Sequence, residues 1–126
     1  MTDPILAAAA LAELTPICLA LPEAGEMTFG VHRRFVVRDK TFAWFNDDHH
    51  GDGLTVLITK AEPGMAETLI AADPARFLRP PYLGHKGWVS LRLDAGQVDW
   101  DEARDLVTDS YLLIAPKRLA ALVQTT

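Results

Sequence analysis

Residues 27–60, MTFGVHRRFVVRDKTFAWFNDDHHGDGLTVLITK, alternate between apolar and polar side chains over several short runs. A period of two is typical of β-strands that bury one face. From Phe29 to Arg38 the pattern predicts a single strand that directs Phe29 toward the core and Arg34 away from it. Because the connections are short, the predicted strands of this region are antiparallel. The elements predicted after the first strand are a turn at 38–40, a strand at 41–45, a polar loop at 46–53 and a strand at 54–60.

A helix is predicted before this region. Asp3 and Pro4 form a good helix start, because a carboxylate can accept from the free N–H groups and proline suits the first turn. Pro16 has no N–H, so we expect a kink there or a restart with Thr15 as a new cap. Pro22 is expected to end the helix.

The segment after the first three strands predicts a helix and a further strand. A short helix from Pro63 should stop near Ala72, because Asp73 precedes a proline and helical geometry is disfavoured there. Residues 76–85 are expected to form a loop or an irregular strand, and residues 88–93 alternate again as a strand.

The last helix has the clearest start signal. Asp99 is in a capping position and Glu102, three residues later, completes a pair that resembles a capping box, while Pro116 breaks the helix. A short terminal helical segment is expected at 117–123. The order α-β-β-β-α-β-β-α predicts an α+β, two-layer sandwich, in which an antiparallel sheet of about five strands has helices packed on one face. The chain, residues 1–126, is expected to be one domain.

Composition excludes several classes of protein. Of 126 residues, 49% are hydrophobic and 23% are charged, which is typical of a globular domain and excludes disordered, collagen-like and coiled-coil chains. A single cysteine, Cys18, excludes an internal disulfide and is expected to pack as a small buried apolar group. The sequence has no apolar run long enough to span a membrane and starts as a poor signal peptide, so a cytoplasmic location is expected.

Charge is unevenly distributed along the chain. The formal net charge of −5 argues against a dedicated nucleic-acid binder, which is usually basic. Residues 31–46 nevertheless carry a net charge of +3 and residues 76–92 a net charge of +4, whereas residues 47–75 between them carry −5. If the two basic segments are neighbours in the sheet, they form a positive surface.

The candidate site is this predicted basic surface. Alternation places the side chains of Arg34, Trp88 and Arg92 on the face turned away from the core. An alternative is a solvated sheet face on which the loop around Tyr82 covers Trp88. The candidate nucleic-acid-binding residues are Arg34, Arg38, Lys40, Arg79, Lys86 and Arg92, which would contact phosphates, and Trp88, which would stack on a base.

Catalytic and metal-binding motifs are weakly represented. The sequence has neither a nucleophile elbow nor a phosphate-binding glycine loop, so we expect no enzymatic activity and no cofactor. Residues 47–53, DDHHGDG, contain several potential metal ligands. Because they all lie in one turn, a solvated hairpin loop is the favoured interpretation.

Short motifs spread over nearly the whole chain point to a family. In order they are LPEA at 21–24, FA at 42–43, DPARF at 73–77, PPYLGHKGWV at 80–89, RLD at 92–94, DSY at 109–111 and APKRL at 115–119. Together they resemble the MmcQ/YjbR family. The resemblance implies a two-layer α+β fold related to the frataxin-like and type III secretion chaperone-like folds, and a proposed DNA-binding activity. Lys86–Trp88 takes the place of the family's Lys and Trp signature, whereas Gly84-His85 departs from the polar residues of many relatives.

Three functional hypotheses follow. The leading one is a non-enzymatic protein that binds DNA weakly through the basic sheet face. The second is a protein-interaction or small-ligand module, or a self-associating one, in which Val36 and Trp88 would anchor a partner by apolar contact. The third is metal binding through the loop at 47–52 and the acidic helices, which follows only from the frataxin-like fold.

Overall fold

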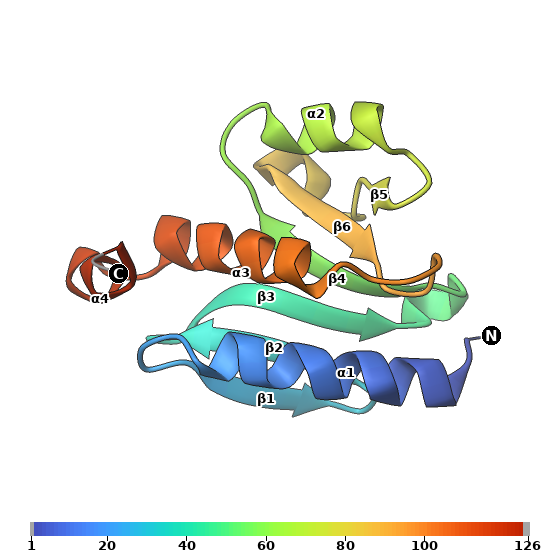
Figure 1. Ribbon diagram of the computed structural model, residues 1–126, viewed down its shortest axis with the longest axis horizontal. Helices are drawn as coiled ribbons and strands as arrows, with labels where there is room; N and C mark the ends of the chain where they lie inside the picture. The colour runs from blue at the N-terminus through green and yellow to red at the C-terminus, as the bar shows by residue number, and fades with distance from the viewer. Residues whose placement is uncertain (1, 125–126) are drawn as a thin grey trace.

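The computed structural model describes residues 2–124, which form a sheet layer and a helix layer (Figure 1). Two 3-10 turns, η1 (His49–Gly51) and η2 (Gly84–Lys86), lie in loops. The helices and strands, in chain order, are α1 (Pro4–Leu19), β1 (Gly25–Phe29), β2 (His32–Val37), β3 (Lys40–Asp47), β4 (Thr55–Lys60), α2 (Met65–Ala72), β5 (Phe77–Leu78), β6 (Trp88–Arg92), α3 (Trp100–Ile114) and α4 (Lys117–Gln124).

The sheet is antiparallel throughout, in the order β1-β2-β3-β4-β6-β5. Four successive strands pair by hairpins, and the chain then leaves β4, forms α2 and β5, and returns as β6 beside β4. Helices α1 and α3 lie against the same face of the sheet, while α2 lies above its β5-β6 end (Figure 1). The predicted α+β fold class and the helices on one face are confirmed, with six strands in place of about five.

The additional strand comes from a turn that the alternation concealed. Residues 25–29 and 32–37 are two strands of a hairpin, with Phe29 opposite His32 and Met27 opposite Arg34. Gly30 adopts φ +59°, which suits the first position of a two-residue hairpin loop. The predicted single strand was therefore wrong, and so was the face assigned to Phe29. In a continuous strand, Phe29 and Arg34 would point to opposite faces. The two-residue turn at Gly30 and Val31 places Phe29 opposite His32, which shares a face with Arg34, so Phe29 lies on the same face as Arg34.

Helix α1 also differs from its expected form. Asp3 caps it, with the Asp3 carboxylate accepting from the N–H of Ile5 at 2.9 Å. Pro16 lies inside the helix, which continues to Leu19 without restarting. Thr15 is not a cap, because its hydroxyl donates to the Leu11 carbonyl at 2.8 Å. Pro16 lies only one turn before the end of α1, so few helical residues follow the position that lacks an N–H.

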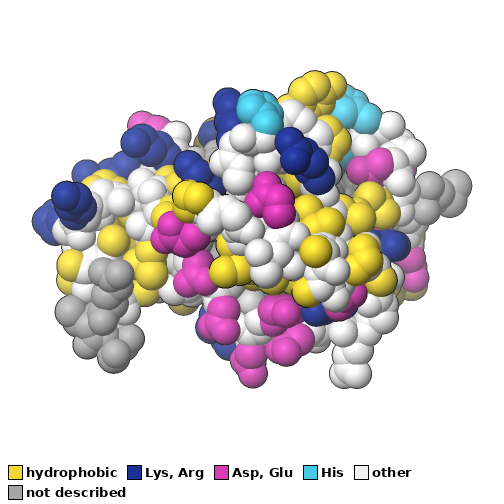
Figure 2. Space-filling view, turned by 90° about the horizontal axis from the view of Figure 1, so that it is seen from above, with side chains coloured by type: hydrophobic (Ala, Val, Ile, Leu, Met, Phe, Trp, Pro, Cys, Tyr) yellow, Lys and Arg dark blue, Asp and Glu magenta, His cyan; other side chains and the backbone are white. Residues whose placement is uncertain are grey.

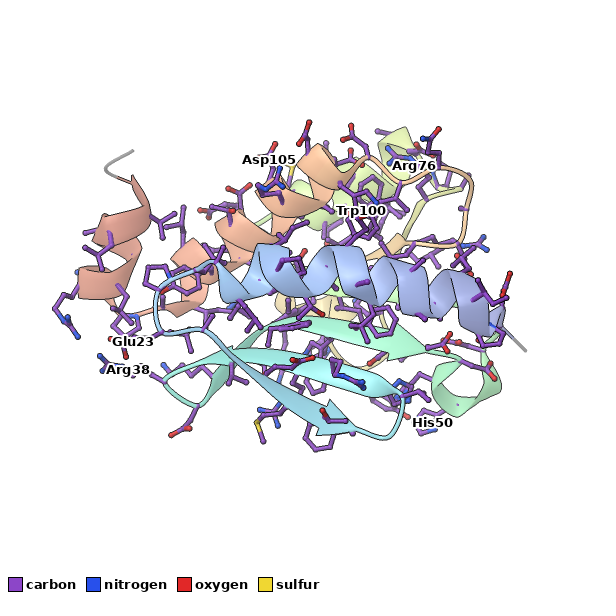
Figure 3. All side chains as sticks on the ribbon, turned by 60° about the horizontal axis from the view of Figure 1, so that its bottom comes forward. Glu23, Arg38, His50, Arg76, Trp100 and Asp105 are labelled. Atoms are coloured by element: carbon purple, nitrogen blue, oxygen red, sulfur yellow. The ribbon has the colours of Figure 1, made fainter. Side chains whose placement is uncertain are left out.

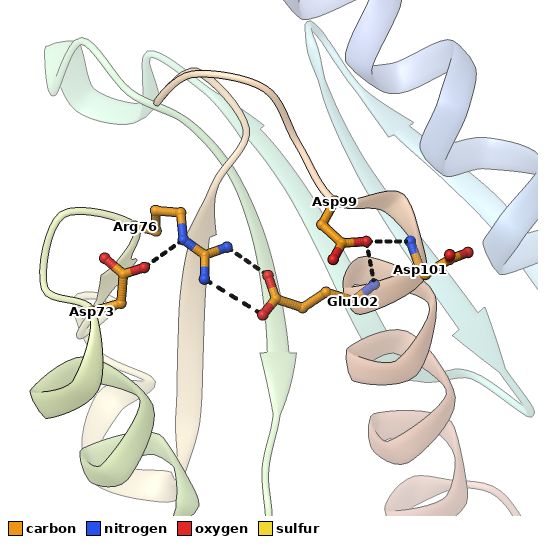
Figure 4. A network of polar contacts seen from close by, with 5 residues as sticks. All are labelled: Asp73, Arg76, Asp99, Asp101 and Glu102. Atoms are coloured by element: carbon orange, nitrogen blue, oxygen red, sulfur yellow. Dashed lines mark hydrogen bonds and ion pairs between the residues drawn. The ribbon is translucent and has the colours of Figure 1, made fainter.

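Helix α3 begins at the predicted cap, but its acidic first turn has a second role. The Asp99 carboxylate accepts from the N–H groups of Asp101 and Glu102, at 3.0 and 3.2 Å (Figure 4). The Glu102 side chain does not complete a capping box. It binds the guanidinium of Arg76, which also holds Asp73 at 2.6 Å. This network joins the end of α2 to the start of α3, and the two carboxylates raise the pKa of Arg76.

The main core lies between the sheet and the helices α1 and α3. Cys18 is completely buried there, and burial raises the pKa of its thiol, as expected of a structural cysteine. Tyr111 packs edge-on against Phe42, with ring centroids 5.3 Å apart, and its hydroxyl donates to the Pro22 carbonyl at 2.6 Å. The largest fully buried side chains are Tyr111, Phe35, Phe42, Phe45, Phe77, Leu14, Leu57, Leu93, Leu119, Val37, Val89 and Val107.

Ser110 joins α3 to the sheet where β3 and β4 diverge. The last paired residues of these strands are Ala43 and Thr59, so Phe42 and Lys60 would form the next pair. The buried Ser110 hydroxyl takes that place, since it accepts from the N–H of Lys60 at 2.9 Å and donates to the carbonyl of Phe42 at 2.6 Å. One side chain therefore satisfies two backbone groups that the ladder leaves open.

We predict that Ser110→Ala lowers the free energy of unfolding by about 1–3 kcal/mol, because two buried backbone groups lose their partner. Chemical denaturation followed by circular dichroism measures this change. Thr108→Ala, two residues before Ser110 in α3, is the matched control and should change stability much less. Equal effects of the two substitutions would contradict the bridging role.

Candidate binding groove on the open face of the sheet

The face of the sheet opposite α1 and α3, here called the open face, carries a row of side chains in register. Arg34 of β2 pairs with Trp44 of β3, and Trp44 pairs with Ile58 of β4. Residues paired across antiparallel strands project to the same side, so these three side chains lie next to one another. Phe29 extends this row to β1 because it shares the face of Arg34.

A loop covers the other half of the open face. Residues 79–87, between β5 and β6, fold back so that Leu83 packs against a small apolar cluster of Val56, Ile58 and Trp88. Trp88 is only 9% exposed. Stacking on a base requires an exposed ring, and the expectation that Trp88 presents one was therefore wrong. The side chain does point away from α1 and α3, as the alternation predicted. The loop around Tyr82 covers it, which agrees with the alternative interpretation of a covered Trp88.

A groove of about 450 Å³ lies between this loop and the β1-β2 hairpin. Trp44 and Ile58 project from the strands and form its floor. Tyr82, which is 80% exposed, belongs to the loop side, and Phe29, which is 45% exposed, belongs to the hairpin side. The complete lining is Phe29, His32, Arg34, Trp44, Asn46, His49, Ile58, Pro81, Tyr82 and Leu83.

Arg34 is held in the groove by aromatic rings. Its guanidinium carbon lies 5.6 Å from the ring centroid of Phe29 and 5.2 Å from that of Trp44, both within cation–π range. Its Nε donates to the hydroxyl of Thr41 at 2.8 Å. Within residues 2–124 it has no ion-pair partner, so its positive charge is available to a ligand in the groove.

Histidines form one end of the groove. The rings of His32 and His49 meet edge-on with centroids 5.1 Å apart, and those of His49 and His50 are 4.0 Å apart. His32 is fixed by its Nδ1, which accepts from the N–H of Asp47 at 3.1 Å. Burial, followed by the charges of His50 and His32, lowers the pKa of His49. A second positive charge at this end of the groove is therefore disfavoured near neutral pH.

The lowered pKa of His49 predicts a pH dependence of stability. The unfolded chain binds a proton at His49 at higher pH than the folded chain, so the free energy of unfolding falls as the pH drops below the ordinary histidine pKa of about 6.5. Urea denaturation between pH 7 and pH 5 should show a shallower fall for His49→Gln than for the wild type. His85→Gln, at an exposed histidine elsewhere, is the control and should follow the wild type. Parallel curves for wild type and His49→Gln would contradict the assignment.

Two of the predicted phosphate contacts are engaged in ion pairs. Arg38, in the turn between β2 and β3, binds Glu23 through two hydrogen bonds of 2.7 and 3.1 Å, at the opposite end of the molecule from His50 (Figure 3). Its pKa is raised by this partner. Arg92 binds Asp94 at 2.9 Å. Each of these guanidinium groups is therefore engaged by a carboxylate and is less available to a phosphate.

The remaining predicted residues lie in different places. Lys40 is exposed at the start of β3, and Arg34 lies in the groove. Arg79 and Lys86 line a separate depression, beyond the loop, together with Lys60. The structure thus divides the seven predicted residues among the groove, ion pairs, an apolar cluster, this depression and the exposed start of β3. The single basic surface expected from alternation is not formed.

Sequence reasoning missed the aromatic part of the groove. Phe29 was assigned to the core face, and Tyr82 was regarded only as a cover for Trp88. Gly30 was the available signal for Phe29, because a glycine between two alternating runs marks a hairpin turn. Nothing in the spacing indicated that His49 packs against His32, since a loop brings them together.

Two features typical of other classes of function are absent from the described part of the chain. Within residues 2–124, no group of three or more His, Cys, Asp and Glu side chains is placed to hold a metal ion. Among these residues there is also no helix of the length and apolar character needed to cross a membrane.

Comparison with known proteins identifies the family. Among curated proteins, none matches this sequence. A crystal structure of the Deinococcus radiodurans protein DR2400, with a DUF419 domain, is similar to this chain with a TM-score of 0.71 and 25% sequence identity, over 92% of this chain and 88% of that chain. The model of the YjbR family matches residues 19–113, which include all six strands and nearly all of α3. The chain therefore belongs to the YjbR family.

Proposed function

We propose that this chain is a small cytoplasmic binding protein without enzymatic activity, and that its ligand occupies the groove on the open face. The observation that carries the proposal is the lining of the groove. Two rings, Phe29 and Trp44, and the exposed ring of Tyr82 surround a space of about 450 Å³, which is within the size range of small-ligand sites. Exposed aromatic rings gathered in a concave site are typical of binding surfaces.

The lining also defines the chemistry of the ligand. Ring and aliphatic carbons from Trp44, Ile58 and Leu83 favour a flat, apolar group. Arg34, held beside that group without an ion-pair partner in the described chain, favours an anionic substituent. A planar, aromatic anion combines both features.

We predict that anilinonaphthalenesulfonate, a dye with a planar naphthalene ring and one sulfonate group, binds the folded protein with enhanced fluorescence. Tyr82→Ala should weaken binding by roughly threefold to tenfold, because one aromatic contact is lost. Arg34→Met, which removes the charge but keeps an apolar chain, should weaken it as well.

Ile5→Ala is the matched control for this titration, because Ile5 is 80% exposed, as Tyr82 is, but lies on α1. It should leave dye binding unchanged. Size-exclusion chromatography of the same variants separates ligand binding from self-association, in which Tyr82→Ala would change the elution volume. Dye affinity that is unaffected by both Tyr82→Ala and Arg34→Met would refute the groove as the site.

Weak DNA binding is the second candidate function. It is favoured by the four predicted cations that have no ion-pair partner within residues 2–124, namely Arg34, Lys40, Arg79 and Lys86. The −5 net charge does not oppose it by itself, because the Debye length is about 8 Å at physiological salt and remote carboxylates are screened.

For DNA binding, we predict a plot of log affinity against log salt with a slope of about −3.6 or less steep, since each of four phosphate contacts contributes about −0.9. Fluorescence anisotropy with labelled duplex DNA measures this slope. Arg79→Ala should reduce the steepness by about one contact, whereas Arg38→Ala, whose charge is already paired, should not. Absence of binding at about 50 mM salt would eliminate this candidate.

A further inference from the structure

Within residues 2–124, the ion pairs leave a distinct group of cations without a carboxylate partner. Six of its twelve Lys and Arg side chains bind a carboxylate: Arg33, Arg38, Arg76, Arg92, Arg104 and Arg118. Of the cations without such a partner in the described chain, Lys60, Arg79 and Lys86 line one depression of about 650 Å³. A single carboxylate, that of Glu67, is part of the same lining.

The backbone around this cationic depression is held in place. The N–H of Ala61, next to Lys60, donates to the Gly87 carbonyl, next to Lys86, at 3.0 Å. The N–H of Lys60 itself is bound by Ser110 at 2.9 Å. Two of the three cations therefore start from backbone positions that hydrogen bonds fix relative to each other.

Arg79 is positioned by a glycine. A Cβ atom at Gly84 would lie 2.4 Å from the Cγ of Arg79 and 2.8 Å from its Nε, so the arginine side chain lies directly across this residue. The N–H of Gly84 donates to the carbonyl of Pro80 at 3.0 Å, which closes the loop beneath the arginine. Gly84 is buried while Arg79 is exposed, so the guanidinium remains accessible to solvent.

The surface charge agrees with this local arrangement. In the view that looks down on α2, several Lys, Arg and His side chains lie in the upper part, and the largest group of Asp and Glu side chains lies along the lower edge (Figure 2). Three cations that form no ion pair within residues 2–124, against one carboxylate in the same lining, raise the local concentration of anions. Ammonium and guanidinium groups are the usual side-chain partners of phosphate oxygens.

We propose that the cationic depression binds a compact phosphate-bearing anion of the size of a diphosphate. Lys60 and Lys86 act as point charges, and Arg79 donates two parallel hydrogen bonds to one phosphate group. The volume of about 650 Å³ exceeds what inorganic phosphate needs and leaves room for an organic substituent. The site is separate from the groove, although residues of one loop, 79–87, contribute to both.

Isothermal titration calorimetry with pyrophosphate tests this proposal. The wild type should bind pyrophosphate, more weakly as the ionic strength rises, and more tightly than it binds sulfate. Arg79→Gln and Lys86→Gln should each weaken binding by about threefold to tenfold, since each removes one charged hydrogen-bond donor. Denaturation midpoints close to that of the wild type would show that both variants are folded.

Two controls make the result specific. Lys40→Gln and Lys117→Gln remove cations that have no ion-pair partner among the described residues and do not line the depression, and should leave pyrophosphate affinity unchanged. A second titration uses a single-stranded oligonucleotide, which carries phosphate groups on a polymer. The proposal is overturned if pyrophosphate does not bind, if Lys40→Gln weakens binding as much as Lys86→Gln, or if only the oligonucleotide binds.

Discussion

The groove and the cationic depression both depend on one constraint, which is that β4 is buried on both of its faces. Five of its six residues, Thr55 to Thr59, are buried. Leu57 faces α1 and α3, whereas Val56 and Ile58 face the opposite side and belong to a separate, smaller apolar cluster. Because exposed apolar side chains on a central strand are unfavourable, a second cover is required there. The loop at 79–87 supplies it, and by stopping short of β2 and β3 it leaves the groove on one side and the cationic depression on the other.

Much of the fold could be predicted from local signals. Asp99 as a helix cap, the stop of α2 before Pro74 and the apolar run of β4 each depend on a few adjacent residues, and each was found in the structure. The hairpin at Gly30 was missed because both of its strands alternate, and the turn between them is only two residues long. That single omission moved Phe29 to the wrong face, and with it the aromatic wall of the groove.

The candidate site was less predictable because it depends on contacts between distant segments. Arg38 and Glu23 are 15 residues apart, and Arg76 and Glu102 are 26 residues apart, so segment charges gave no sign of these ion pairs. Trp88 illustrates a different limit. Its direction follows from strand alternation, but its exposure is set by Leu83 in a loop whose path no periodicity describes. Arg79 and Lys86, which precede β6, were singled out from the sequence, but their shared depression with Lys60 was not foreseen.

The two edges of the sheet are unequal in a way that limits how the protein can assemble. At one edge, β5 contributes only two residues, too few main-chain groups to template another strand. At the other edge, β1 is five residues long, and its side chains from Glu26 to Phe29 are exposed. Of the two edges in the described chain, β1 is therefore the one suited to sheet extension between copies. An antiparallel junction between two such edges is self-complementary and consumes both of them, so lateral growth of this kind ends at a closed pair and cannot continue into a fibre.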